Sequence, residues 1–307
     1  MEIAATREID QLDTEAVVQR QATRARLADF WSLLKSLQTA LLLVTAISAY
    51  TLTRGLPFDP LEGTLMAIGL LLSISGCTVL NMLLDRDIDG LMERTAARPL
   101  PDGRIRPFEA AIFGGLLSLA GLAISFALDL RFGVVVTLGF GFDLLVYTTW
   151  LKRRTPLSII FGGISGGMPV LAGRVLALGR VDMVGILLAG SILLWIPSHI
   201  LTLAMRYAND YHRAGVPVWP NVYGHRATRL FIAAANLLNT LVLMGCALLL
   251  RVHLVALVPL LGMSLGMFAL SALQLIAPTD KRNWVLFKVA SFYMLVSSLL
   301  VTVGCLI

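Results

Sequence analysis

The sequence predicts an all-α membrane protein, a multi-spanning bundle of nine transmembrane helices. Hydrophobic residues make up 57% of the 307 residues and charged residues only 14%, whereas a soluble protein carries about 25% charged residues. The mean hydropathy is +0.80. Apolar runs long enough to cross a bilayer recur along the chain. We predict spans at about 33–53, 62–84, 109–129, 132–150, 157–177, 183–205, 228–250, 253–276 and 284–306.

The distribution of Lys and Arg predicts the orientation of these spans. Roughly four fifths of the 25 Lys and Arg residues fall in the N-terminal segment and in every second loop, and such segments face the cytosol. We therefore expect a cytosolic N-terminus and a C-terminus on the outer side of a cell membrane, with the lipid bilayer as the surroundings. The net charge of +6 follows from this bias, so it does not indicate nucleic acid as a partner.

The chain divides into two parts by composition. Residues 1–30 are polar and lack the apolar core of a signal peptide, which predicts a cytosolic N-terminal arm. Residues 31–307 predict a single transmembrane domain. Loops of mixed charge follow the second and sixth spans, and this placement predicts two four-helix halves that face each other, plus a ninth helix. Three cysteines, Cys77, Cys246 and Cys305, fall inside spans and are interpreted as small apolar fillers.

Three polar residues at the end of the second span carry the first functional signal. Asn81, Asp85 and Asp89 are spaced four and four, so a single helix would present them on one face. Carboxylates are costly in lipid, and a cluster there indicates a functional site. Mg²⁺ prefers oxygen ligands from one or two carboxylates plus substrate phosphates. The pattern predicts that Asn81, Asp85 and Asp89 bind a magnesium-bridged diphosphate at the membrane surface.

The other charged loops add candidates. The loop after the sixth span contains Asp210 and Tyr211, and the loop after the fourth span is purely basic, with Lys152 and Arg153. Taken alone, the basic loop is explained by membrane topology. The acidic residues run against the basic bias, so topology does not explain them.

Several blocks of residues resemble a known family. Asn-x-x-x-Asp-Arg-Asp-Ile-Asp at 81–89, followed by Arg-Thr-x-x-Arg-Pro-Leu at 94–100, resembles the first signature of the UbiA superfamily of intramembrane prenyltransferases. Tyr-Thr-Thr-Trp-Leu-Lys-Arg at 147–153 and Asp-Tyr-x-x-Ala-Gly-x-Pro at 210–217 resemble blocks of its haem-farnesylating branch. The resemblance covers roughly residues 33–230.

The resemblance implies an enzyme that transfers a farnesyl group from farnesyl diphosphate to a vinyl group of protohaem (haem b), with addition of water to give haem O. Haem would be a substrate and not a cofactor, and Mg²⁺ would be the cofactor, as two ions. Asn81, Asp85 and Asp89 would hold one ion, and Asp210 the second from the opposite half. The candidate protein partners are a haem A synthase or a terminal oxidase assembly.

The resemblance also implies roles for the basic and aromatic residues. Phosphate oxygens would be bound by the planar fork of Arg or the point charge of Lys, at Arg94, Arg98, Lys152 and Arg153. Tyr211 belongs to the implied substrate-binding set. The implied catalytic residues are Asp85, Asp89, Asp210 and Tyr147, whose ring face would stabilise the allylic cation. A plain interfacial aromatic is the alternative for Tyr147.

His199 lies inside the sixth span. A histidine there is either bonded to a neighbouring helix in the core or placed for function. The resemblance favours contact with haem, as an iron ligand or a propionate partner. The glycine-rich run at 162–167 lies within a span, so it is interpreted as a site of close helix packing and not as a phosphate loop.

Three alternative functions remain open from the sequence. One is a UbiA-type prenyltransferase with another acceptor, such as a quinone precursor, chlorophyll or a glycerol lipid. Another is a transporter, although transporters place their charges near the bilayer midplane and these charges lie at one membrane face. The third is a non-catalytic haem-binding membrane protein, which would retain His199 but would not need both acidic clusters.

Overall fold

The structure is a computed structural model that describes residues 19, 23–57 and 59–307. Within this part of the chain, nine helical segments are long and apolar enough to cross a membrane, and no strand is present. The predicted all-α membrane fold with nine spans is confirmed. Most of the predicted N-terminal arm, residues 1–18 and 20–22, lies outside the described residues, whereas residues 23–33 are helical.

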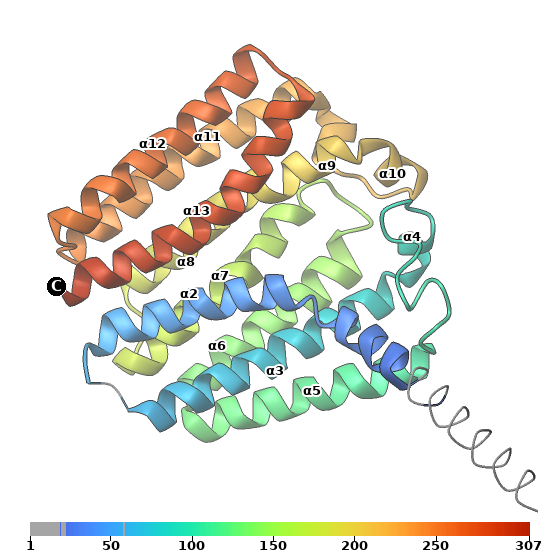
Figure 1. Ribbon diagram of the computed structural model, residues 1–307, viewed down its shortest axis with the longest axis horizontal. Coiled ribbons are helices and arrows are strands. Elements are labelled where there is room, and N and C mark those ends of the chain that lie inside the picture. The colour runs from blue at the N-terminus through green and yellow to red at the C-terminus, as the bar shows by residue number, and fades with distance from the viewer. Residues whose placement is uncertain (1–18, 20–22, 58) are drawn as a thin grey trace, which may run out of the picture.

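The spans follow one another along the chain, and the longest connections are residues 85–106 after α3 and 207–218 after α9 (Figure 1). Two of them continue from an α-helix into π-helical turns, and two short helices, α4 and α10, lie outside the spans. In chain order the elements are α2 (Ser36–Arg54), α3 (Pro60–Leu84), α4 (Arg86–Gly90), α5 (Pro107–Leu128), α6 (Leu130–Gly141) with η1 (Phe142–Leu151), α7 (Ser158–Leu178), α8 (Met183–Ile196) with η2 (Pro197–Leu201) and α9 (Thr202–Arg206), α10 (Ala208–Arg213), α11 (Trp219–Leu249), α12 (Leu254–Ile276) and α13 (Asp280–Leu306).

Short polar residues set several helix starts. Asp129 accepts hydrogen bonds from the backbone N–H groups of Arg131 and Phe132 at the start of α6. Asp59 and Asp182 cap α3 and α8 in the same way, as expected for N-cap residues. The break predicted beside Arg131 therefore exists, and the Asp129 cap explains it.

The nine spans form a ring in chain order. Each span packs against the next, and α13 packs against α2 to close the ring. Helix α2 also packs against α7, and Gly173 makes this contact possible. A Cβ on Gly173 would lie 2.1 Å from the carbonyl oxygen of Ala46, so a larger residue would push the two helices apart. The close approach fixes the position of α2 beside the interior of the ring.

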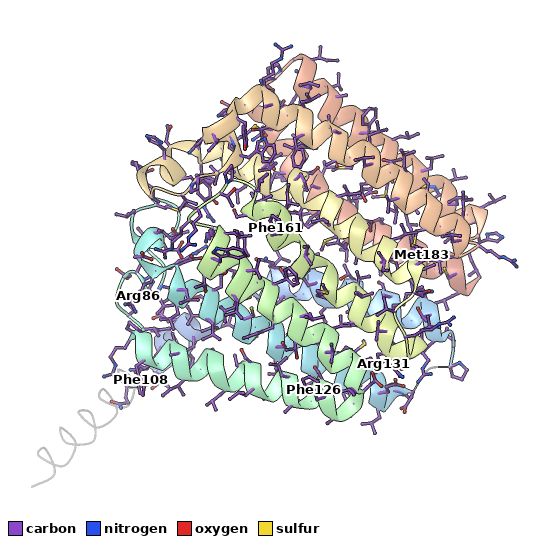
Figure 2. The ribbon with its side chains drawn as sticks, turned by 180° about the vertical axis from the view of Figure 1, so that it is seen from behind. Arg86, Phe108, Phe126, Arg131, Phe161 and Met183 are labelled. Atoms are coloured by element: carbon purple, nitrogen blue, oxygen red, sulfur yellow. The ribbon has the colours of Figure 1, made fainter. Side chains whose placement is uncertain are left out.

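The outer faces of the ring are apolar, as expected for helices in lipid. Phe108, Leu119 and Val258 are at least two-thirds exposed. Figure 2 shows Arg86 and Phe108 at one end of the bundle and Arg131 and Met183 at the other. The chain is an integral membrane protein.

Two spans differ from their predicted form. The expected single helix through Asp89 is interrupted, because α3 ends at Leu84 and Asp85 has φ −91° and ψ 0°. Asp89 still donates its backbone N–H to the carbonyl of Asp85 at 2.8 Å, so the spacing of the acids is kept. The seventh span begins at Trp219 and not near residue 228, and Gly224 interrupts it with φ 81°.

Candidate active site

One end of the bundle gathers most of the predicted site residues, whereas Asn81, Tyr147 and His199 lie within the spans. We call it the polar end and define it by the segments 85–106, 152–157 and 207–218, which carry α4 and α10 (Figure 1). Arg213 joins its two sides, because one guanidinium nitrogen contacts Glu93 at 2.9 Å and Asp210 at 2.5 Å. The segments that follow the second and sixth spans therefore meet, as the two predicted halves require.

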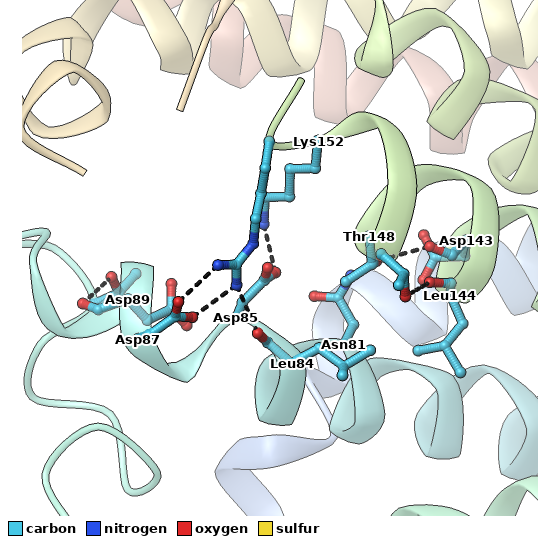
Figure 3. A network of polar contacts seen from close by, with 12 residues as sticks. Asn81, Leu84, Asp85, Asp87, Asp89, Asp143, Leu144, Thr148 and Lys152 are labelled. Atoms are coloured by element: carbon cyan, nitrogen blue, oxygen red, sulfur yellow. Dashed lines mark hydrogen bonds and ion pairs between the residues drawn. The ribbon is translucent and has the colours of Figure 1, made fainter. Parts of the chain in front are cut away.

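Asp85 and Lys152 form a buried ion pair at the polar end (Figure 3). The ammonium group of Lys152, which follows η1, donates to Oδ2 of Asp85. The other carboxylate oxygen, Oδ1, is buried without a hydrogen-bond partner. Burial raises the pKa of Asp85, and Lys152 only partly opposes this shift. Burial also opposes the charge of Lys152, but Tyr147 and Asp85 outweigh it and raise the pKa of Lys152.

Asn81 lies one helical turn before Asp85 and contacts the fourth span. Its amide nitrogen donates to the hydroxyl of Thr148 at 2.6 Å, and Thr148 donates to the backbone carbonyl of Asp143 at 2.7 Å. This chain of bonds ties α3 to η1 (Figure 3). The bond uses the amide nitrogen, so the amide oxygen is the atom of Asn81 that a cation would contact.

Asp89 is also buried and paired. Arg98 donates to its Oδ2 at 2.6 Å, and the hydroxyl of Thr95 donates to its backbone carbonyl at 2.8 Å. Arg94 lies over the ring of Tyr207, 5.5 Å from the centroid. Both predicted phosphate-binding arginines of this loop therefore lie at the polar end, one of them already bound to a predicted metal ligand.

Arg153, which was predicted to bind phosphate, is bound to an aspartate and a backbone carbonyl of the chain itself. It forms a two-point contact with Asp87, at 2.7 Å for each bond, and donates to the carbonyl of Leu84 at 2.9 Å. These bonds lower the pKa of Asp87 to about 2. Arg153 thus fastens α4 and the end of α3 to the loop after η1.

Asp210 supplies the carboxylate of the opposite half. The side chain is buried, its Oδ1 accepts the bond from Arg213, and its Oδ2 is buried without a partner. Tyr211 beside it packs with Ile88, Val216 and Val218 in a small apolar cluster. This cluster packs the segment of Asp85 and Asp89 against the segment of Asp210.

The carboxylates of the polar end are too few to hold Mg²⁺ by themselves and would need oxygens from a substrate to complete its shell. In the described part of the chain, no three His, Cys, Asp or Glu side chains gather closely enough to hold a metal ion. Oδ1 of Asp85 and Oδ2 of Asp210 are nevertheless buried oxygens without partners, an arrangement that costs free energy unless something binds them. Mg²⁺ accepts one or two carboxylates and completes its shell with phosphate and water. The donor set therefore fits a diphosphate-bridged ion.

A cavity of about 640 Å³ lies within the ring. Residues of α2, α3, α6, η1, α7, α8, η2 and α13 line it, and most are apolar. Its ionisable wall residues include Lys35, Asp143 and His199. A cavity of this size and character suits a long apolar ligand with a few fixed polar contacts.

Lys35 was not predicted as a site residue. It lies at the break before α2, has φ 43°, and lines the cavity. Burial, with the charges of Arg98 and Lys152, lowers its pKa to about 8. Lys35 thus connects the cavity electrostatically to the polar end. The signal that would have identified it is its place inside the predicted span 33–53, because an ionisable residue within a span indicates function.

His199 faces the interior of the bundle. Its ring stacks between the rings of Trp195 and Phe287, with centroid-to-centroid distances of 5.0 Å and 4.7 Å. The hydroxyl of Ser291 lies 3.1 Å from its Nδ1. The stacking covers both ring faces, so Nε2 is the ring atom with which His199 can bind a ligand in the cavity.

Tyr147 lies between the polar end and the glycine-rich run. The Lys152 ammonium is 5.8 Å from its ring centroid, and a Cβ on Gly162 would lie 2.7 Å from its ring. A Cβ on Gly167 would lie 2.7 Å from the carbonyl oxygen of Ala189. The run therefore permits close packing, as predicted, and the ring of Tyr147 already faces a cation.

Comparisons with known proteins identify the family of the chain. The sequence model of the UbiA prenyltransferase family matches residues 42–299. A protoheme IX farnesyltransferase of Korarchaeum cryptofilum is 45% identical over 221 residues, which cover 72% of this chain and 74% of that protein. One of Symbiobacterium thermophilum is 40% identical over 211 residues, which cover 68% of this chain and 70% of that protein.

Solved structures share the fold. A structure described as digeranylgeranylglyceryl phosphate synthase superposes with a TM-score of 0.76 at 21% identity, covering 92% of this chain and 99% of that chain. A UbiA homologue from Archaeoglobus fulgidus bound to GPP and Mg²⁺ superposes with a TM-score of 0.66 at 13% identity, and the superposition covers 89% of this chain and 99% of that chain. The chain belongs to the UbiA prenyltransferase family.

Proposed function

We propose that this protein transfers a farnesyl group from farnesyl diphosphate to a vinyl group of protohaem, and that water adds to the product to give haem O. The names of the two relatives reported above, both protoheme IX farnesyltransferases, support this acceptor. The observation that carries the chemistry is the pair of unpartnered, buried carboxylate oxygens on Asp85 and Asp210. They come from opposite halves, and each of the two carboxylates is paired with a basic side chain, Lys152 or Arg213.

The polar end would bind the diphosphate through an exchange of partners. Lys152 and Arg98 now neutralise Asp85 and Asp89. When a diphosphate enters, these cations turn to its oxygens, and the carboxylates become free for metal. Two Mg²⁺ ions, held by Asn81, Asp85 and Asp89 on one side and by Asp210 on the other, would neutralise the leaving diphosphate. The Archaeoglobus homologue bound to GPP and Mg²⁺ supports Mg²⁺ as the metal.

The cavity would hold the farnesyl tail and the acceptor. Departure of diphosphate leaves an allylic cation, which water would destroy, so an apolar enclosure is needed around it. The cavity wall provides it with residues such as Leu70, Val136 and Ile192. Tyr147 stands near the polar end, where its ring would face the cation once Lys152 has turned to phosphate.

His199 would bind the haem. The Ser291 contact at Nδ1 fixes the ring orientation, and a histidine that binds iron commonly has its other nitrogen held in this way. Haem would thus be fixed by its iron while a vinyl group is presented to the farnesyl carbon. The haem is the acceptor substrate in this scheme.

We place the polar end on the cytosolic side of the cell membrane. The excess of Lys and Arg in the segments of that side supports this orientation, with the N-terminus inside and the C-terminus outside. A haem A synthase or a terminal oxidase assembly is the proposed recipient of the product.

The test is incubation of the purified protein with haem b, farnesyl diphosphate and Mg²⁺, followed by mass analysis of the haem. The expected product is haem bearing one farnesyl group and one added water, and it should disappear when Mg²⁺ is chelated. Parallel reactions contain a phenolic quinone precursor, chlorophyllide or a glycerol phosphate lipid. Prenylation of one of these, with haem left unchanged, would assign the protein to another branch of the family.

A further inference from the structure

Asp143 is an acidic residue inside the fourth span, in the first turn of η1. It lines the same cavity as His199. Figure 3 shows it on the far side of Thr148 from the carboxylates of Asp85 and Asp89. An ionisable side chain at such a place is costly and is retained where it has a function. The binding scheme above gives Asp143 no role.

The carboxylate of Asp143 has only weak hydrogen-bond donors. The Cys77 thiol lies 3.3 Å from Oδ2 and the Ser165 hydroxyl 3.5 Å from Oδ1. The Ser165 proton is directed to the carbonyl of Gly162 at 2.6 Å, and a thiol is a weak donor. Among the described residues, no ion pair and no backbone N–H to this carboxylate is found. The carboxylate is therefore available to bind a proton.

We propose that Asp143 accepts the proton of the water molecule that is added to the haem after the new carbon–carbon bond has formed. This inference rests on the proposed function. The vinyl β-carbon bonds to C1 of the farnesyl group as the C1–oxygen bond to diphosphate breaks, which leaves a cation at the vinyl α-carbon. The oxygen of water then bonds to this α-carbon. Its surplus proton passes to Asp143 and later to solvent or diphosphate, so no oxidant or reductant is needed.

The other ionisable residues of the cavity suit this step less well. His199 is stacked on both faces and held at Nδ1 by Ser291. Lys35 in its charged form has no lone pair with which to accept a proton. The thiol of Cys77 is directed at Asp143 itself. Asp143, with the hydroxyl of Ser165 beside it, offers two polar groups to a water molecule at an otherwise apolar wall, and a buried water needs such partners.

Loss of the base should change the product and not only the rate. Without a proton acceptor for the water, the α-cation can lose a proton from the adjacent carbon and form an alkene. This product is lighter than haem O by the mass of one water. A residue that merely supported the fold would lower both products equally.

The experiment compares Asp143→Asn with wild-type protein and with Asp129→Asn. The control makes the same change at the N-cap of α6, directly before the same span and outside the cavity lining, and Asn is an equally good N-cap residue. Farnesyl diphosphate binding is measured first, and then both haem products by mass. For Asp143→Asn we expect unchanged binding, hydroxylated haem formed at least about a hundred times more slowly, and the alkene as the main product. Asp143→Glu should restore part of the hydroxylated product.

Three results would overturn the proposal. The first is an unchanged share of hydroxylated product in Asp143→Asn, and the second is an equal loss of both products. The third is a loss of donor binding, which would assign Asp143 to the diphosphate or to the fold. If Asp143→Asn does not accumulate, Asp143→Ser is judged by the same results. Absence of any farnesylated haem from the wild-type protein would instead contradict the proposed function itself.

Discussion

The ammonium group of Lys152 binds one carboxylate oxygen of Asp85 and leaves the other buried without a partner. Two residues that directly follow the second and fourth spans thus provide an unpartnered carboxylate oxygen and an ammonium group that can move to phosphate. A buried pair of this kind is weak evidence for stability, because desolvation offsets much of the attraction. Its arrangement is better explained by exchange of partners during substrate binding.

The first prediction concerns Lys152. Lys152→Met should weaken the binding of farnesyl diphosphate at least about tenfold, because the phosphate loses a charged partner and Asp85 keeps an unpaired buried charge. Isothermal titration in detergent measures this. Lys281→Met, which removes an exposed lysine, is the control. Equal affinities of wild type and Lys152→Met would remove Lys152 from the diphosphate site.

The second prediction is a dependence of donor binding on pH. The pKa of Lys35 is lowered to about 8, so the charged form dominates below pH 8 and disappears as the pH rises through 8. Affinity for farnesyl diphosphate should therefore fall between about pH 7.5 and 9. Lys35→Arg should remove this dependence, because arginine stays charged throughout. The same pH profile in Lys35→Arg as in wild type would show that another group titrates.

The third prediction concerns His199 and Ser291. His199→Ala should weaken haem binding, followed by the Soret absorption, and leave farnesyl diphosphate affinity nearly unchanged. Ser291→Ala should weaken haem binding by about 10- to 100-fold, because the second nitrogen loses its partner. Ser298→Ala is the control, since the hydroxyl of Ser298 donates to the carbonyl of Met294 within its own helix, α13. Unchanged haem affinity in His199→Ala would exclude His199 from the acceptor site.

The fourth prediction concerns packing at Gly173. Gly173→Ala should destabilise the protein by about 1–3 kcal/mol, because the new methyl group meets the backbone of α2. Gly245→Ala has nothing within 4 Å of the added Cβ and should be neutral or slightly stabilising. Thermal unfolding in detergent compares them. Equal midpoints would show that α2 and α7 can separate without cost.

Much of the fold could be predicted from the sequence. Span length and the charge bias are direct consequences of the bilayer, and nearly every span begins within a few residues of its predicted position. The break at Asp85 could not be read in this way, because it depends on contacts from Arg153 to Leu84 and Asp87, which the fold brings together. The kink at Gly224 results from its positive φ angle, which the pattern of apolar residues does not predict.

The site was predictable where the signal lay in a motif. The acids at 81–89 and the block at 210–217 meet at the polar end, as their spacing and placement indicated. Lys35 and Asp143 were missed, although both fell within predicted spans, where ionisable residues indicate function. Cys77 was interpreted as an apolar filler, yet its thiol contacts Asp143. These contacts join residues far apart in the chain, so only the fold reveals them.

The most direct test of the account is the turnover of Asp85→Asn and Asp210→Asn with saturating Mg²⁺, farnesyl diphosphate and haem b. Each amide keeps the shape of the side chain but removes the charge that would hold a cation. We expect each change to reduce turnover at least about a hundredfold, while Asp102→Asn, an exposed acid of the same loop, stays active. Near-normal turnover in either Asp85→Asn or Asp210→Asn would contradict the claim that carboxylates from both halves act on one diphosphate.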